Sequence, residues 1–90
     1  MLYKNRENQP FFSVIIPTYN SSEYVGKTLS TVLEQTYNNY EVIVSDDGST
    51  DNTVKTTRAV FDRYGHRENK ILINSHEGAA AARNRGIEAA

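Results

Sequence analysis

Three short polar clusters contain the side chains of this sequence that could bind a ligand. They are Pro17-Thr18-Tyr19-Asn20, Asp46-Asp47-Gly48-Ser49-Thr50-Asp51 and Asn74-Ser75-His76-Glu77-Gly78. Each cluster follows a short apolar run that contains valine, isoleucine or leucine. In parallel α/β sheets, ligands bind at the carboxyl ends of the strands. We therefore expect the three clusters to open on one edge of a sheet.

The second cluster contains two adjacent carboxylates, Asp46 and Asp47. Like charges side by side repel each other, which favours a use for them outside the strand. A carboxylate accepts well from the N3–H donor of uracil or from a ribose hydroxyl. Strand alternation turns the two side chains to opposite faces, so the two acids should have different functions. A helix-capping loop explains the same residues equally well.

Tyr19 and His76 are the aromatic side chains of these clusters. The ring of Tyr19 offers a face on which a base could stack, and a half-buried loop tyrosine without a ligand is the alternative. His76 is the only histidine of its loop. Its isolation favours a surface role over catalysis.

Arg83 is a further candidate for ligand contact. It shares a helical stripe with three residues of the last segment, Ala80, Asn84 and Ile87. This stripe predicts a guanidinium on the inward face, where a charge needs a partner. The partner could be the base or the phosphates of a nucleotide, or one of the two adjacent acids in a structural ion pair.

The apolar patterns predict three strands that alternate with three helices. Strands are expected at 11–16, 40–45 and 71–73, and the first two runs suit strands buried on both faces. Helices are expected from an N-cap at Ser21 or Ser22, from 49–51 to an end at Gly65, and from Gly78 to Ala90. This order predicts right-handed crossovers and a parallel sheet of α/β type.

Composition limits the classes of partner. The 90 residues make at most one small domain, and 10 Lys+Arg against 11 Asp+Glu leave a net charge of −1. No overall field therefore attracts the chain to nucleic acid or to anionic lipid. The sequence has no cysteine, which excludes disulfides and thiolate metal sites and fits a reducing compartment.

Neither the start of the chain nor its apolar runs suggest a membrane segment. Residues 1–10 are polar, and we expect them to form a disordered leader ahead of a domain at 11–90. The longest apolar runs are far shorter than the roughly 20 residues needed to cross a bilayer. We expect a cytoplasmic protein, with the inner face of the membrane as the location if the full-length protein is membrane-associated.

Taken together, three motifs resemble the opening signature of the family-two glycosyltransferases. These motifs are Ser13–Asn20, Glu41–Asp51 and Ala82–Gly86, in this order, and the resemblance runs from about Phe12 to Ala90. It implies a three-layer, Rossmann-like GT-A fold with a parallel sheet, here truncated after the third β-α unit. It also implies inverting transfer of a sugar from a nucleoside-diphosphate sugar, most often a UDP-sugar, to a hydroxyl of a glycan or another acceptor.

The resemblance assigns four nucleotide-binding residues. Pro17 and Tyr19 would line the uracil pocket, Asp47 would accept from uracil N3–H, and Arg83 would reach the base or the phosphates. Asp46 and Asn20 would support the loops without touching the ligand.

The sequence departs from the family pattern at one loop. His76-Glu77-Gly78 stands where the family commonly has Asn-x-Gly. No catalytic or metal-binding residue is assigned in this chain, because the resemblance places the carboxylate base and the ligands of Mg²⁺ or Mn²⁺ beyond Ala90. The 90 residues alone are therefore expected to be inactive, and strand 11–16 is expected to be an unpaired edge that invites self-association.

Two other functions fit the α/β pattern. A non-catalytic nucleotide-binding or regulatory module is one, although receiver-like domains have their paired acids after the first strand and this chain has them after the second. A dinucleotide-binding oxidoreductase is the other, but no G-x-G-x-x-G follows the first strand.

Overall fold

The three apolar runs form parallel strands at the centre of one sheet. The computed structural model describes residues 2–6, 11–35, 39–64 and 69–90. The parallel strands are β2 (Phe11–Thr18), β3 (Tyr40–Asp46) and β4 (Asn69–Ile73). Phe12 pairs with Tyr40 at one end of β3, and Asp46 pairs with Ile73 at the other. All seven residues of β3 are buried, as expected for a strand covered on both faces.

A fourth strand precedes the three that the sequence predicts. β1 (Leu2–Arg6) pairs antiparallel with β2 in the sheet order β1-β2-β3-β4. The expectation of a disordered leader is therefore wrong for residues 2–6, while residues 1 and 7–10 lie outside the described part of the chain. The expectation of an unpaired edge at β2 is also wrong, because β1 and β3 pair with its two sides. The segment has a mostly polar sequence without an apolar run of strand length, so its pairing with β2 was not predicted.

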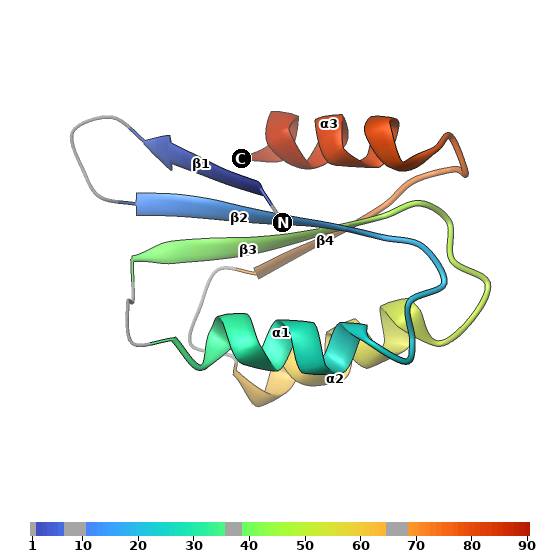
Figure 1. Cartoon of the computed structure of the whole chain (residues 1–90), viewed down its shortest axis with the longest axis horizontal. Coiled ribbons are helices and arrows are strands. Elements are labelled where there is room, and N and C mark those ends of the chain that lie inside the picture. The colour runs from blue at the N-terminus through green and yellow to red at the C-terminus, as the bar shows by residue number, and fades with distance from the viewer. Residues whose placement is uncertain (1, 7–10, 36–38, 65–68) are drawn as a thin grey trace.

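The helices lie on both faces of the sheet and make three layers (Figure 1). α1 (Val25–Leu33) and α2 (Thr53–Arg63) cover one face, and α3 (Ala79–Ala89) covers the other. The predicted three-layer α/β fold is confirmed. The predicted end of the second helix at Gly65 lies outside the described residues.

The first helix begins later than its sequence signals suggest. α1 starts at Val25, and no side chain caps it. Ser21 contributes its carbonyl instead, which accepts from the N–H groups of Tyr24 and Val25 at 2.9 Å. A backbone turn thus takes the place of the predicted serine N-cap.

The larger apolar core lies between the sheet and the α1–α2 layer. Alternate residues of β2 and β3 pack there against the inward stripes of both helices. Each fully buried aliphatic side chain contributes about 1.5–3 kcal/mol relative to an exposed one. The core residues are Val14, Ile16, Val25, Leu29, Val32, Leu33, Tyr40, Val42, Val44, Val60 and Phe61.

α3 lies very close to the opposite face of the sheet. Its buried residues are Ala82 and Gly86, and a Cβ at Gly86 would overlap the Cγ2 methyl group of Ile15. The predicted inward stripe is therefore wrong: Arg83 is exposed, and Ile87 is 37% exposed. A helix this close to a sheet presents its smallest residues inward, so its most apolar side chain does not mark the buried face.

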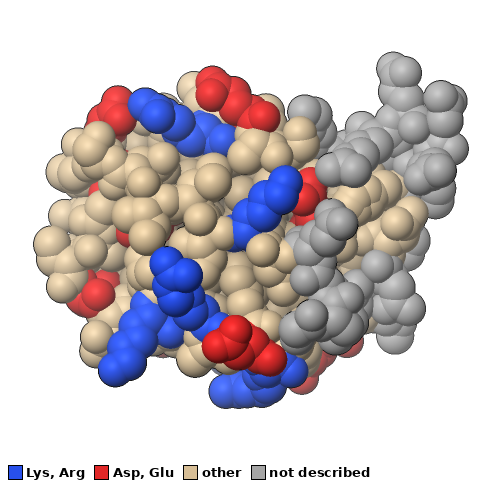
Figure 2. Space-filling view, turned by 180° about the vertical axis from the view of Figure 1, so that it is seen from behind, with Lys and Arg blue, Asp and Glu red and all other residues tan. Residues whose placement is uncertain are grey.

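Charges of both signs lie on the face that Figure 2 views from behind. Lys and Arg side chains gather at the lower left of that view, with Asp or Glu beside them, and the rest of the described face is mainly uncharged. No helix in the part of the chain that the structure describes is long and apolar enough to span a bilayer.

Candidate functional site

The three polar clusters meet at one edge of the sheet, as predicted. The loops that follow β2, β3 and β4 run together at the same end of the molecule (Figure 1). Backbone hydrogen bonds continue the strand pairing into these loops: Asp47 N–H donates to the Thr18 carbonyl at 2.9 Å, and Asn74 N–H donates to the Asp46 carbonyl at 2.8 Å. The sheet thus fixes the spacing between the clusters.

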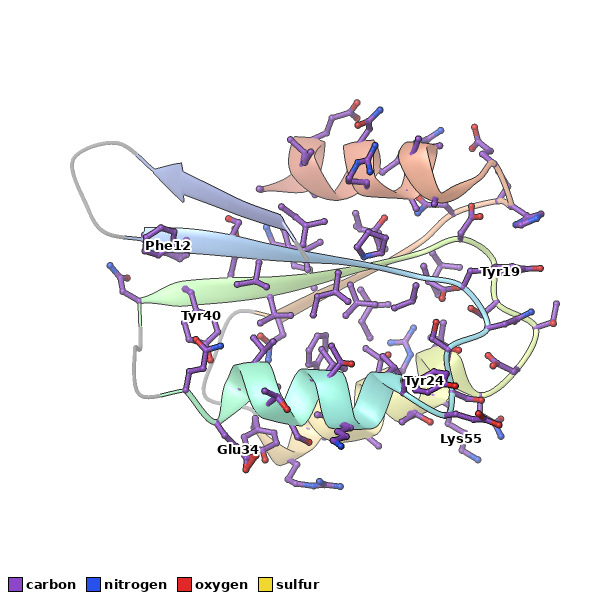
Figure 3. All side chains as sticks on the ribbon, viewed as in Figure 1. Phe12, Tyr19, Tyr24, Glu34, Tyr40 and Lys55 are labelled. Carbon is purple, nitrogen blue, oxygen red and sulfur yellow. The ribbon has the colours of Figure 1, made fainter. Side chains whose placement is uncertain are left out.

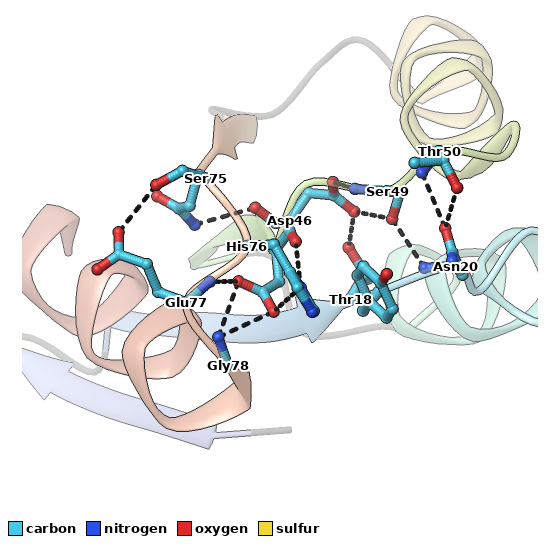
Figure 4. Close-up of polar contacts among 12 residues, drawn as sticks. Thr18, Asn20, Asp46, Ser49, Thr50, Ser75, His76, Glu77 and Gly78 are labelled. Atoms are coloured by element: carbon cyan, nitrogen blue, oxygen red, sulfur yellow. Dashed lines mark hydrogen bonds and ion pairs between the residues drawn. The ribbon is translucent and has the colours of Figure 1, made fainter.

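Asp46 ties two of the loops together. Its buried carboxylate accepts from the hydroxyl of Thr18 at 2.7 Å and from the N–H and hydroxyl of Ser49 at 2.7 and 2.6 Å (Figure 4). All these donors come from the chain itself. This geometry agrees with the supporting role expected of Asp46.

Asn20 links the same two loops at the surface. Its backbone is in the left-handed region, with φ of 47°, which asparagine tolerates better than most residues. Its N–H donates to the Ser49 hydroxyl at 2.8 Å, and its side-chain oxygen accepts from the N–H of Thr50 at 2.9 Å. Asn20 therefore braces the loops, as expected.

Asp51 connects the segment before α1, at Ser22, to the start of α2, at Thr53. Its carboxylate accepts from the hydroxyl and the N–H of Thr53, at 2.5 and 3.0 Å, and from the N–H of Ser22 at 3.2 Å. The Thr53 hydroxyl is the largest cause that lowers the pKa of Asp51 from 3.8 to about 2. Asp51 is therefore an anionic brace of the loop.

Asp47 points to the opposite face from Asp46 and lies at the start of α3. One carboxylate oxygen accepts from the N–H of Glu77 at 2.9 Å, and the other accepts from the N–H of Gly78 at 3.1 Å. The Glu77 N–H is the largest cause that lowers the pKa of Asp47, with further contributions from Gly78 and His76, and burial opposes them. Asp47 is therefore a carboxylate at neutral pH.

Gly78 has the backbone conformation that this contact requires. Its φ is 105°, which side chains other than hydrogen rarely permit, although a Cβ there would meet no atom within 4 Å. Glycine is therefore needed at this position for its backbone angle. In this conformation, the successive N–H groups of Glu77 and Gly78 both point at the Asp47 carboxylate.

Tyr19 and His76 form a stacked aromatic pair beside Asp47. The two ring centroids are 4.5 Å apart, and the ring planes differ by 23°. Tyr19 is 44% exposed and lies at the loop end of the sheet, away from Phe12 and Tyr40 at the other end (Figure 3). Nδ1 of His76 lies 3.0 Å from a carboxylate oxygen of Asp47.

A cavity of about 240 Å³ opens between these residues. Three of the four predicted site residues, Pro17, Tyr19 and Asp47, line it together. The other lining residues are Thr18, His76, Gly78, Ala79 and Ala82. Typical small-molecule sites enclose about 300–1,000 Å³, so this cavity suits one ring of a larger ligand.

Arg83 does not line this cavity. It follows Ala82, which does, and its side chain is exposed on α3. The structure therefore does not bring Arg83 to the ring pocket that Tyr19 and Asp47 share.

Two larger hollows, of about 420 and 490 Å³, lie along β4. Both are lined in part by Ile71, and neither contains a residue of the first two polar clusters. They follow the outer edge of the sheet, whereas the smaller cavity combines an aromatic ring, a carboxylate and the end of a helix. The smaller cavity is therefore the candidate site.

His76 is the site residue that the sequence interpretation missed. The sequence grouped it with the strand-end clusters, but a single histidine gave no sign of its partners. Its contacts depend on Tyr19 and Asp47, which follow other strands. Only the parallel register of three strands reveals that the imidazole reaches both.

The described residues do not provide an evident metal site. Within 2–6, 11–35, 39–64 and 69–90, no group of three or more His, Asp or Glu side chains is arranged to hold a metal ion. The oxygens of Asp46 and Asp47 already accept from donors of the protein, so they do not form an open set of ligands.

Comparison with known proteins identifies the family. The sequence profile described as Glycosyl transferase family 2 matches residues 13–90. Glycosyltransferase AglE of Haloferax volcanii is 48% identical over 82 residues, which are 88% of this chain and 26% of AglE. The Escherichia coli protein WfgD, named as a UDP-Glc:alpha-D-GlcNAc-diphosphoundecaprenol beta-1,3-glucosyltransferase, is 39% identical over 77 residues, which are 84% of this chain and 29% of WfgD.

A solved structure shares the fold. Mannosyltransferase PcManGT of Pyrobaculum calidifontis, solved in complex with GDP-Man and Mn²⁺, matches with a TM-score of 0.82 and 30% identity. The match covers 87% of this chain and 24% of PcManGT. The chain thus spans about a quarter of the length of these relatives.

These similarities favour a transferase over a non-catalytic nucleotide-binding module or an oxidoreductase. The profile match includes all three motifs quoted from the sequence, and the structural match shows that their arrangement is that of a GT-A fold. The chain belongs to glycosyl transferase family 2.

Proposed function

We propose that the cavity between Tyr19 and Asp47 holds the base of a nucleoside-diphosphate sugar, with a UDP-sugar as the donor. The ring of Tyr19 stacks on the base, and the carboxylate of Asp47 accepts its N–H. Pro17 closes one side of the pocket. The observation that carries the proposal is that a flat ring and an anionic acceptor, far apart in sequence, line one ring-sized cavity.

The chemistry of the bases supports uracil as the occupant. Uracil offers one N3–H donor to a carboxylate, and guanine offers N1–H and an amino group. Adenine presents an acceptor nitrogen beside its amino group, which a carboxylate repels. The small volume of the cavity, about 240 Å³, favours the single ring of a pyrimidine over a purine.

Arg83 is proposed to contact the phosphates or the outer edge of the base. It is exposed on α3 next to Ala82, which lines the cavity. A guanidinium binds phosphate oxygens through paired hydrogen bonds, and an exposed arginine can turn toward a ligand without leaving a buried charge behind.

Transfer itself is proposed to need residues outside this chain. A divalent Mg²⁺ or Mn²⁺ would offset charge on the leaving diphosphate, and a carboxylate would take the proton of the acceptor hydroxyl during inverting attack. The described residues do not fit such a metal, so no step of the reaction is assigned to them. Their role is to bind and orient the donor.

The remaining partners follow from this role. The acceptor is a hydroxyl of a glycan or a similar molecule, and nucleic acid is not a partner, in keeping with the net charge of −1. A cytoplasmic location, at the inner face of the membrane for a longer protein, fits the supply of nucleotide sugars and the absence of cysteine.

Calorimetry with UDP, GDP, ADP and NAD tests the proposal. We expect UDP to bind the chain more tightly than the other three. Tyr19→Ala should weaken UDP binding by about 5- to 150-fold, since stacking of a base on an aromatic ring contributes about 1–3 kcal/mol. Tyr24→Ala is the matched control, because Tyr24 is also a loop tyrosine and is 68% exposed.

A sugar-transfer assay tests whether the chain binds the donor without transferring the sugar. The 90-residue chain should bind UDP and yet transfer no sugar from a UDP-sugar, with or without Mn²⁺. Preferential binding of NAD, or equal effects of the Tyr19 and Tyr24 substitutions, would remove the basis of the proposal.

A further inference from the structure

His76 already makes both contacts that the proposed base would make. Its ring is stacked on Tyr19 with a centroid distance of 4.5 Å. Its Nδ1 lies 3.0 Å from the Asp47 carboxylate and 3.3 Å from the Asp47 carbonyl oxygen. Both oxygens can only accept, so Nδ1 carries a proton and donates. A flat ring on Tyr19 and a ring N–H on Asp47 are the features by which uracil would bind.

The stacked pair leaves no room for a base between its rings. Stacked aromatic side chains have centroids about 4.5–7 Å apart, and this pair is at the short end of that range. An inserted base would need a stacking distance on each of its two faces. The imidazole must therefore leave the Tyr19 ring before a base can take its place there.

The rest of the site can remain in place when the imidazole leaves. The side chain of His76 is 62% exposed, so rotation into solvent is open to it. The N–H groups of Glu77 and Gly78 continue to hold the Asp47 carboxylate. The carboxylate oxygen released by Nδ1 becomes the acceptor for the N–H of the base.

We infer that His76 is an internal competitor for the base: in the free protein it occupies the ring face of Tyr19 and the carboxylate oxygen of Asp47 at the side of the cavity, and it leaves them when a nucleotide binds. This inference rests on the proposed function. Competition by His76 weakens the observed binding of the nucleotide. The apparent dissociation constant equals the intrinsic constant divided by the fraction of molecules in which the imidazole is turned away from Tyr19. Removal of the imidazole should therefore tighten nucleotide binding.

The test is calorimetry of UDP with the whole chain and with His76→Ala. The variant should bind UDP about 2- to 10-fold more tightly, the factor that corresponds to one lost stacking contact. The matched control is His66→Ala, which removes the other histidine of the chain and should leave the dissociation constant for UDP unchanged.

A second measurement needs no substitution at the site. In the free wild-type protein, the imidazole proton resonances of His76 should show the ring-current shift of Tyr19, and saturating UDP should remove it. The same spectra of His66→Ala assign the signals, because only His76 then contributes.

Each outcome has a defined meaning. Tighter binding by His76→Ala, or loss of the ring-current shift with UDP, supports the inference. If wild type binds UDP and His76→Ala binds it equally or less tightly while the imidazole signals stay unchanged, His76 is not a competitor and the proposed function stands. If neither protein binds any nucleotide, the proposed function and the inference both fail.

Discussion

Asp46 and Asp47 are neighbours in sequence, but the sheet gives their carboxylates different surroundings. Asp46 lies on the α1–α2 side, where hydroxyl and N–H donors from two loops surround it. Asp47 lies on the α3 side and lines the cavity. Substitution of the first acid should therefore affect stability, and substitution of the second should affect nucleotide binding as well.

Asp46→Ala should destabilise the protein by about 3–5 kcal/mol, because it leaves the donors of buried Thr18 and half-buried Ser49 without their acceptor. A urea denaturation series measures this loss. Asp62→Ala, at an exposed position of α2, is the control and should change stability by no more than about 0.5 kcal/mol. Equal losses in the two variants would show that Asp46 does not hold the loops.

The brace formed by Asp51 should make stability depend on pH in the acid range. Because the folded pKa of Asp51 is about 2 and its ordinary value is 3.8, the stabilisation is complete above about pH 4 and is lost as the pH falls toward 2. Wild type should therefore melt at a higher temperature than Asp51→Ala at pH 7, with the gap narrowing between pH 4 and pH 2. Thermal unfolding at pH 7, 4, 3 and 2 measures the gap, and a constant gap would contradict the assignment.

Position along the chain was enough to predict some site residues and not others. Pro17 lies near the end of β2, and Tyr19 and Asp47 directly follow β2 and β3, so the sheet alone brings the three residues to one cavity. Arg83 was judged from a helical stripe, and the orientation of that helix depends on how closely it approaches β2. His76 needed knowledge of neighbours from two other strands. Local sequence patterns predict which residues stand at strand ends, but they do not predict contacts between elements.

At the scale of elements, the position of α3 depends on its small residues. Gly86→Ala adds a methyl group that overlaps the Cγ2 of Ile15, a β-branched side chain that cannot easily move aside. We expect a net loss of about 1–3 kcal/mol despite the higher helix propensity of alanine. Urea denaturation measures it.

Gly26→Ala is the matched control for this substitution. Gly26 is in α1, and a Cβ there would lie 3.5 Å from Thr56, an ordinary contact. Alanine should therefore stabilise this helix by up to about 1 kcal/mol. Two glycine-to-alanine changes with opposite signs would establish the close packing of α3, whereas a gain at both positions would contradict it.

Strands and helices with an apolar pattern were predicted within a few residues, and β1 was not predicted at all. The runs in β2 and β3 are largely buried, so burial leaves a signal in composition, whereas the apolar run of β4 is partly exposed. β1 is an outer strand with a mostly polar sequence, and it pairs with β2 through its backbone. Because backbone hydrogen bonds do not depend on side-chain type, no local pattern predicts this strand.

For the whole molecule, β1 determines whether the edge of β2 is available to other chains. Removal of residues 1–8 should expose the backbone N–H and C=O groups along that edge and cause self-association that increases with concentration. Sedimentation of the shortened and complete chains at about 10 to 200 μM, a range in which such association is expected, measures the self-association. A shortened chain that stays monomeric would show that β1 does not protect the edge.

The antiparallel pairing of β1 also bears on the order of events as the chain folds. Arg6 pairs with Phe11, a close neighbour in sequence, whereas the parallel partner of Phe12 is Tyr40. Closing a short loop takes less time and less entropy than bringing distant segments together. The hairpin of β1 and β2 should therefore be the first strand pair to form, so that an emerging polypeptide has one side of its central strand protected before the third strand has been synthesised.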